Sequence, residues 1–218
     1  MIMRLVRIVF LGIFLISFLT GKSQIENDPY VKKVFSSEEI QSLDKLLSFV
    51  DKQVLLKTKK ENIAEAYHAL FDTLQIYMTN NEKDKVPMEE NLRAEIFQIL
   101  KEDNIFNEIF IEGIPIKAYL NDTVFENPEF LKYIEINPNG KYRKLLKLMS
   151  KVDPGFNYIN ESFNELGELS ITLVAGMIMN SENYQFEIDR IRLFGAIVYL
   201  TREETMQTSY ENYLKNKK

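Results

Sequence analysis

Apolar residues recur at intervals of three and four along most of this chain, and this period constrains the fold more than any other feature. Such spacing predicts amphipathic helices, because residues three and four apart share one helix face. Behind the capping-box pattern Ser36-x-x-Glu39, the residues expected on the buried face are Ile40, Leu43, Leu46, Leu47, Val50 and Val54. The pattern predicts a helix over 37–57 and a second over 61–79, and we expect the two to form a helical hairpin.

The C-terminal half predicts two further helices. Asp153-Pro154 is a helix-start signal for a long helix over 155–179, whose second half, 169–179, is apolar almost all round. A helix of that kind is buried on most sides. With a last helix over 184–203, it is predicted to form an antiparallel hairpin at the centre of the core. Gly176 and Gly195 lie inside these apolar helices, so we expect each to contact a separate neighbour.

Residues 104–137 show weaker periodicity. Ile109 to Leu120 contains Gly113 and Pro115 and is read as a short extended piece, while Asn127-Pro128 predicts a short helix to about Ile136. A third helix is expected after Pro87, and another over 141–152. The chain is therefore predicted to be an all-α single domain of seven or eight helices over 24–218, with a frayed tail after about residue 210.

The first 23 residues have the pattern of a secretory signal peptide. Arg4 and Arg7 precede an uncharged apolar run from Ile8 to Leu19, and small residues at 21 and 23 suit a cut after Ser23. We therefore predict export to a bacterial periplasm, the cell surface or the extracellular space. An uncleaved anchor is the alternative, but the run is shorter than the roughly 20 apolar residues of a spanning helix. After cleavage we expect no stable membrane span.

Composition excludes several classes of site. The chain has no Cys and a single His, which removes thiolate chemistry and most zinc centres. It lacks the glycine-rich nucleotide-binding motifs and the G-x-S-x-G elbow, so no cofactor is expected. The net charge is −5; residues 1–23 hold three bases and no acid, which leaves −8 for the remainder. That balance argues against nucleic acid, or anionic lipid, as the main partner.

Two sets of residues are the candidate ligand-binding positions. Glu65 and His68 form a Glu-x-x-His pair on a predicted helix, the spacing used by di-iron bundles, although such a site needs the pair twice. Glu165 and Glu168 belong to an acidic ladder on the predicted long helix. Glu168 is a candidate for partial burial, and the alternative is a solvated face or an ion pair with Arg190 or Arg192. No metal site and no catalytic residue is predicted from either set.

The sequence is therefore interpreted as an exported helical domain without catalytic activity that binds another protein or a cell-envelope component. One alternative is a binder of an apolar small molecule held between 169–179 and 188–200. This alternative arises because eleven Tyr, fifteen Phe and eight Met could line such a cavity. A further alternative is an enzyme that uses Glu168.

Overall fold

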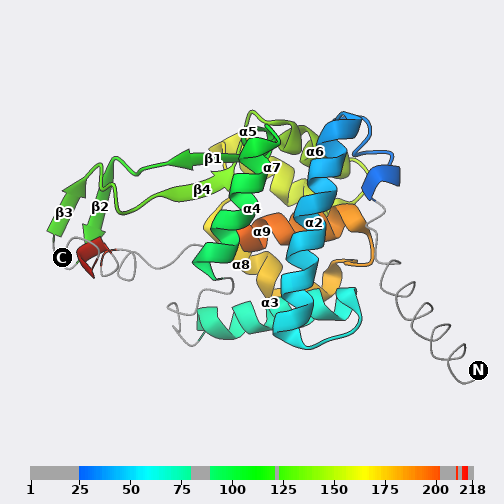
Figure 1. The fold of residues 1–218 in the computed structure, drawn as a ribbon, viewed down its shortest axis with the longest axis horizontal. Coiled ribbons are helices and arrows are strands. Elements are labelled where there is room, and N and C mark those ends of the chain that lie inside the picture. Colours follow the sequence, from blue (N-terminus) through cyan, green and yellow to red (C-terminus); the bar gives the residue numbers. More distant parts are fainter. Residues whose placement is uncertain (1–24, 80–88, 121–122, 202–209, 211–212, 216–218) are drawn as a thin grey trace, which may run out of the picture.

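The computed structural model describes residues 25–79, 89–120, 123–201, 210 and 213–215, so the predicted signal peptide over 1–23 lies outside the described residues. The described chain is mostly helical, and Figure 1 shows a helical body with a narrow β-ribbon extending from it. The α-helices are α2 (Ser37–Thr58), α3 (Ile63–Thr79), α4 (Glu90–Glu102), α5 (Phe106–Ile109), α6 (Lys141–Met149), α7 (Asn157–Leu166), α8 (Ile171–Met179) and α9 (Asp189–Leu200). Short 3-10 turns are η1 (Ile25–Asn27), η2 (Pro154–Phe156) and η3 (Ser181–Asn183).

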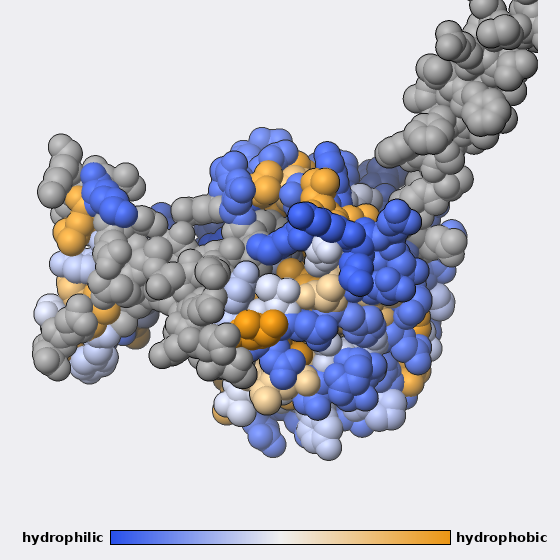
Figure 2. Space-filling view, turned by 90° about the horizontal axis from the view of Figure 1, so that it is seen from below, coloured by the Kyte–Doolittle hydropathy of each residue, from blue (hydrophilic) through white to orange (hydrophobic). Residues whose placement is uncertain are grey.

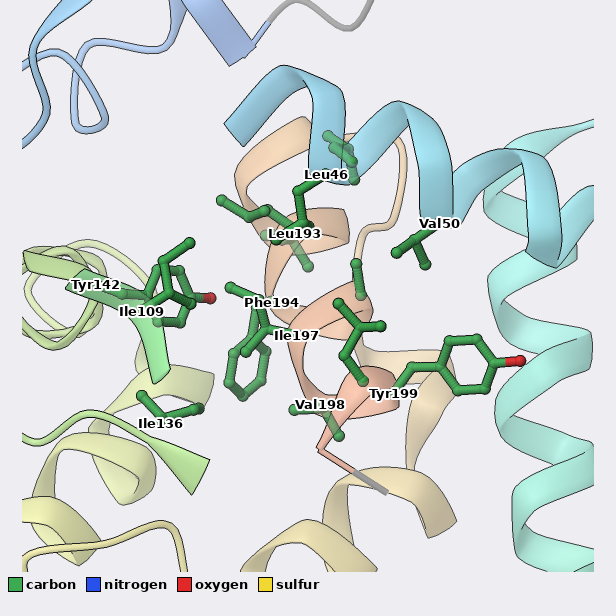
Figure 3. Packing of buried hydrophobic residues seen from close by; sticks show 14 of the residues in the cluster. Leu46, Val50, Ile109, Ile136, Tyr142, Leu193, Phe194, Ile197, Val198 and Tyr199 are labelled. Atoms are coloured by element: carbon green, nitrogen blue, oxygen red, sulfur yellow. The ribbon is translucent and has the colours of Figure 1, made fainter. Parts of the chain in front are cut away.

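The first predicted helix begins where the sequence places it. The Ser36 hydroxyl accepts a hydrogen bond from the Glu39 amide (3.3 Å), and the Glu39 carboxylate accepts one from the Ser36 amide (2.8 Å). The capping box is therefore confirmed. Helices α2 and α3 pack against each other as expected. They cross at a steep angle in Figures 1 and 3 instead of lying side by side.

Helix α9 lies at the centre of the body. All residues from 191 to 200 are buried, so this helix has no solvent-facing side over that stretch. Figure 3 shows Leu46 and Val50 of α2 on one side of it, and Ile109, Ile136 and Tyr142 on another. The expectation that the last helix occupies the interior is confirmed, although it begins at Asp189 and not at 184.

The single long helix predicted over 155–179 is wrong, because the chain turns between α7 and α8. Gly167 ends α7 in the left-handed conformation (φ 78°), which glycine adopts without steric cost. Ser170 then caps α8 by accepting a hydrogen bond from the Leu173 amide. Apolar residues continue at intervals of three and four across this break, so periodicity alone predicts one continuous helix. Helix α8 packs mainly on α3, so the predicted long hairpin with α9 is also wrong in its first arm.

The all-α prediction is wrong for residues 110–136, which form two small antiparallel sheets. Strand β1 (Phe110–Gly113) pairs with β4 (Tyr133–Ile136), and β2 (Lys117–Leu120) pairs with β3 (Thr123–Glu126). The pairs follow one another along a single ribbon, with β2 and β3 at its far end (Figure 1).

The helix predicted from Asn127 to about Ile136 does not form. Asn127 has a positive φ (45°), and its amide donates to the Ile116 carbonyl across the ribbon (2.9 Å). A turn follows, in which the Leu131 amide bonds the Pro128 carbonyl, and the chain then enters β4. Pairing with β1, which lies far back in the sequence, therefore overrides the local helix-start signal of Asn-Pro.

None of the described helices combines the length and the apolar composition needed to cross a membrane.

The two helix glycines lie in different surroundings, which allows a paired test. A Cβ on Gly195 would lie 2.9 Å from Phe186 Cε1 and 3.2 Å from Tyr67 Cδ1, whereas a Cβ on Gly176 would meet nothing within 4 Å. The rings of Phe186 and Tyr67 are themselves buried. The expected close contact is thus confirmed at Gly195 and wrong at Gly176.

Gly195→Ala should lower the free energy of unfolding by up to about 2 kcal/mol, because overpacking costs about 1–3 kcal/mol and exceeds the gain in helix propensity. Gly176→Ala should raise it by up to about 1 kcal/mol, since only the propensity gain applies. Urea denaturation of both variants measures this. An increase in both would show that α9 is not tightly packed.

A second pair of variants tests the buried hydroxyls. Among the described residues, the buried Tyr142 hydroxyl has no hydrogen-bond partner, whereas the Tyr67 hydroxyl donates to Asp51 Oδ1 (2.9 Å). Tyr142→Phe should therefore raise the free energy of unfolding by about 1 kcal/mol, and Tyr67→Phe should lower it by about 1–3 kcal/mol. Chemical denaturation at neutral pH distinguishes them; equal losses would mean that the Tyr142 hydroxyl is satisfied.

Candidate functional site

Glu65 and His68 lie one turn apart on α3, as the sequence predicted. Glu65 is exposed at the start of the helix, where its backbone amide donates to Asn62 Oδ1 (3.1 Å). His68 is half-buried, with its ring 5.0 Å from that of Phe186 in an edge-on contact. No group of three His, Asp or Glu side chains able to hold a metal ion occurs among the residues described. Ligand binding at this pair stays a prediction.

Glu165 and Glu168 are not on one helix. Glu165 is exposed on α7, and Glu168 is exposed in the connection to α8, so Glu168 is not partly buried and its exposure fits the alternative of a solvated residue. Its predicted cation partners bind elsewhere: Arg190 pairs with Asp28, and Arg192 pairs with Asp51 and Asp189. The structure thus places the four candidate residues on two separate parts of the chain. Ligand binding at Glu165 and Glu168 also stays a prediction.

A buried charged group that the sequence reasoning missed lies where α2, α3 and α9 meet. The Arg192 guanidinium donates to Asp51 Oδ2 (3.0 Å), Asp189 Oδ1 (2.8 Å) and the Phe186 carbonyl (3.0 Å). The Tyr67 hydroxyl donates to the other oxygen of Asp51. A signal for this group was present, because Arg192 is the one charged residue between Ile191 and Leu200.

The chemistry of this group is that of a structural ion pair. Burial raises the pKa of Asp51 to about 6, against the opposing attraction of Arg192 and the hydrogen bond from Tyr67. The same burial, with the nearby Asp51 charge, raises the pKa of Tyr67 well above its ordinary value. Since these groups are engaged with one another, we assign them to joining three helices.

Among the described elements, the β2–β3 end of the ribbon is the one with the least evident role in building the core. Successive residues of a strand point to opposite faces. Lys117 and Tyr119, with their partners Glu126 and Val124, therefore share one face. The other face carries Ala118 opposite Phe125.

The Phe125 face packs against aromatic side chains from the following turn and from the C-terminal segment. The ring of Phe125 lies 5.2 Å from that of Phe130 and 5.4 Å from that of Tyr210. The Phe130 ring is also 5.2 Å from Tyr210 and 5.3 Å from Tyr213. The C-terminal segment, predicted only as a polar tail, thus supplies two tyrosines to the ribbon.

The Tyr119 face is open to solvent. The exposed fractions are 68% for Tyr119 and 51% for Val124, which face each other across the two strands. The amine of Lys117 lies 4.0 Å from the Glu126 carboxylate beside them. Figure 2 shows apolar side chains on this ribbon, at the left of the view, next to hydrophilic ones.

The strand edges of the ribbon are a second feature. Each sheet has two strands, so each strand has one edge that no other described strand pairs. A two-stranded ribbon is only marginally stable by itself in water. The exposed Tyr119 and Val124 on such an element contribute nothing to the core, which makes this face the candidate functional site. Its signal in the sequence was the β-branched and aromatic run Thr123-Val124-Phe125, opposite the segment read as extended.

Comparisons with protein-family models, with curated protein sequences and with solved structures give no significant match for this chain.

The buried Asp51 carboxyl predicts a specific pH dependence of stability. Its folded-state pKa is raised above the unfolded value of 3.8, so the folded protein takes up a proton first as the pH falls. Between pH 7 and 5 the free energy of unfolding should therefore rise by about 1 kcal/mol relative to Asp51→Asn.

Denaturation of both proteins across this range, with an NMR titration of the Asp51 carboxyl carbon, measures the effect. A relative loss of stability from pH 7 to 5, or a titration midpoint below 4, would show that Arg192 outweighs burial.

Proposed function

We propose that this protein is an exported, non-catalytic interaction domain that uses the β2–β3 ribbon to dock a polypeptide partner. The observation that carries the proposal is the open ribbon face, on which Tyr119 and Val124 lie opposite each other at high exposure. Tyr is enriched where proteins meet, because its ring supplies apolar area and its hydroxyl a hydrogen bond.

The shape of the site favours a polypeptide over a small molecule. Small-molecule sites are concave and enclose most of their ligand, whereas the ribbon extends away from the body (Figure 1). Unpaired strand edges can add a strand from another chain, with main-chain hydrogen bonds for affinity and alternate side chains for specificity. A partner strand laid along β2 or β3 would meet both an edge that no described strand pairs and the exposed apolar residues.

Export is the second part of the proposal. It is supported by the charged, apolar and small-residue pattern of residues 1–23 and is compatible with the absence of Cys. The net charge of −5 supports a protein or envelope partner over nucleic acid. The apolar-ligand and Glu168 enzyme hypotheses stay predictions, since no contact described here favours either.

Site-specific photocrosslinking in the cells that make the protein tests the docking face. A photoreactive residue replaces Tyr119 in one variant and Tyr158 in the control, because Tyr158 is equally exposed (67%) but lies on α7 of the body. We expect a discrete crosslinked polypeptide from position 119 and none of that mass from 158. Val124→Ser in the first variant should reduce the yield at least severalfold.

Equal crosslinking from both positions, or none from 119 with a folded protein in the exported fraction, would contradict docking at the ribbon. Recovery of the protein only from the cytoplasm, with residues 1–23 intact, would contradict export.

A further inference from the structure

Five lysines surround one shallow hollow on the body, in a chain whose net charge is negative. The hollow has a volume of about 400 Å³ and lies between α6, the chain just after it, and the segment before α2. Its lysines are Lys33, Lys141, Lys144, Lys147 and Lys151. The rest of its lining is aliphatic, from Val34 and Leu148, and no carboxylate belongs to it.

The five lysine amines differ in whether they already contact other groups of the protein. Lys141 binds the Glu39 carboxylate (2.5 Å), and the Lys33 amine lies over the Tyr30 ring, 5.3 Å from its centre. Lys144, Lys147 and Lys151 are exposed, and none of the three forms an ion pair with a described residue. Lys144 and Lys147 lie three residues apart on one face of α6, and Lys151 follows in the turn after Met149.

Local helix energetics do not account for this arrangement. A cation near the C-terminus of α6 suits the helix dipole, which explains Lys147. Like charges three residues apart on a helix repel, however, so placing Lys144 between Lys141 and Lys147 costs stability. Lys33 comes from a different segment and still joins the same hollow. A concentration of amines without a structural role indicates an anionic partner.

We propose that this lysine surface rests on an anionic lipid membrane, with the amines at the headgroup phosphates and Val34 and Leu148 at the boundary with the acyl chains. Exposed lysines on flexible stems suit many diffuse phosphates better than one tightly bound anion, which calls for buried, forked donors such as arginine. Each lysine near such a surface contributes about 1 kcal/mol. Aliphatic residues among the amines add the apolar contact of an interfacial helix.

The negative net charge does not prevent this contact. At physiological ionic strength the Debye length is about 8 Å, so a membrane senses the charges of the facing surface and little of the rest. Helix α6 belongs to the body, whereas β2 and β3 lie at the far end of the ribbon (Figure 1). Both surfaces can therefore be occupied at the same time, and the membrane contact does not depend on the docking proposal.

Vesicle co-sedimentation of the full chain tests the proposal. Because the apolar run over 8–19 can itself bind lipid, the measured quantity is the ratio of partitioning into phosphatidylglycerol-containing vesicles to that into phosphatidylcholine vesicles. The patch variant is Lys144→Glu/Lys147→Glu/Lys151→Glu. The control Lys52→Glu/Lys60→Glu/Lys132→Glu changes the net charge equally at exposed positions outside the hollow.

We expect the wild-type ratio to exceed one and to fall at high salt, and the patch variant to lower it at least about tenfold while the control leaves it nearly unchanged. The variant Lys144→Gln/Lys147→Gln/Lys151→Gln replaces the patch variant if the glutamates disturb folding, because glutamine is a good helix former. It removes three positive charges without adding negative ones, so we expect it to lower the ratio less than the glutamate variant does.

A wild-type ratio of one, or equal losses in patch and control variants, would overturn the proposal. Release of the protein by inorganic phosphate at constant ionic strength would indicate a small-anion site and would also overturn it.

Discussion

Burial of α9 from Ile191 to Leu200 is the constraint on which the body depends. A helix with no solvent-facing side must satisfy any charge that it carries, because an unpaired buried charge costs several kcal/mol. Arg192 is that charge, and its partners come from its own helix (Asp189), from α2 (Asp51) and from the carbonyl of Phe186. Tyr67 of α3 completes the group through Asp51. Correct neutralisation of one arginine therefore requires that three helices meet in one arrangement.

Other ion pairs attach the outer elements to this centre. Arg190, next to the buried stretch of α9, binds Asp28 in the segment before α2 (2.9 Å). Asp103 at the end of α4 accepts bonds from Ser42 (2.8 Å) and Lys45 (2.7 Å) of α2. Beyond β1 and β4, the far end of the ribbon is held by one strand pair and by aromatic contacts with Tyr210 and Tyr213. Stability is thus concentrated in the body, and the exposed apolar residues of the ribbon remain available.

Helices whose formation depends on local signals, such as a capping box and an apolar stripe, were correctly predicted from the sequence. The capping box at Ser36 and the apolar stripe behind it determine α2, and both are present in the structure. The break at Gly167 was missed because apolar spacing continues across it. The sheet of β1 and β4 was missed because a pairing across twenty or more residues leaves no periodic trace at either strand.

The candidate site was less accessible to sequence reasoning. The predicted ligand-binding residues Glu65, His68, Glu165 and Glu168 were chosen for their side-chain chemistry. A docking face is instead defined by which side chains are exposed, and exposure is known only from the fold. The basic run Lys141–Lys144 was visible in the sequence, but its continuation through Lys147, Lys151 and Lys33 depends on α6 packing beside the segment before α2.

Native-state amide hydrogen exchange tests the division between a stable body and an available ribbon most directly. We predict that amides of residues 193–200 in α9 exchange only through global unfolding, whereas those of 117–120 and 123–126 exchange faster by orders of magnitude in the isolated protein. Ribbon amides that exchange as slowly as those of α9 would contradict the account, because the ribbon would then belong to the cooperative core.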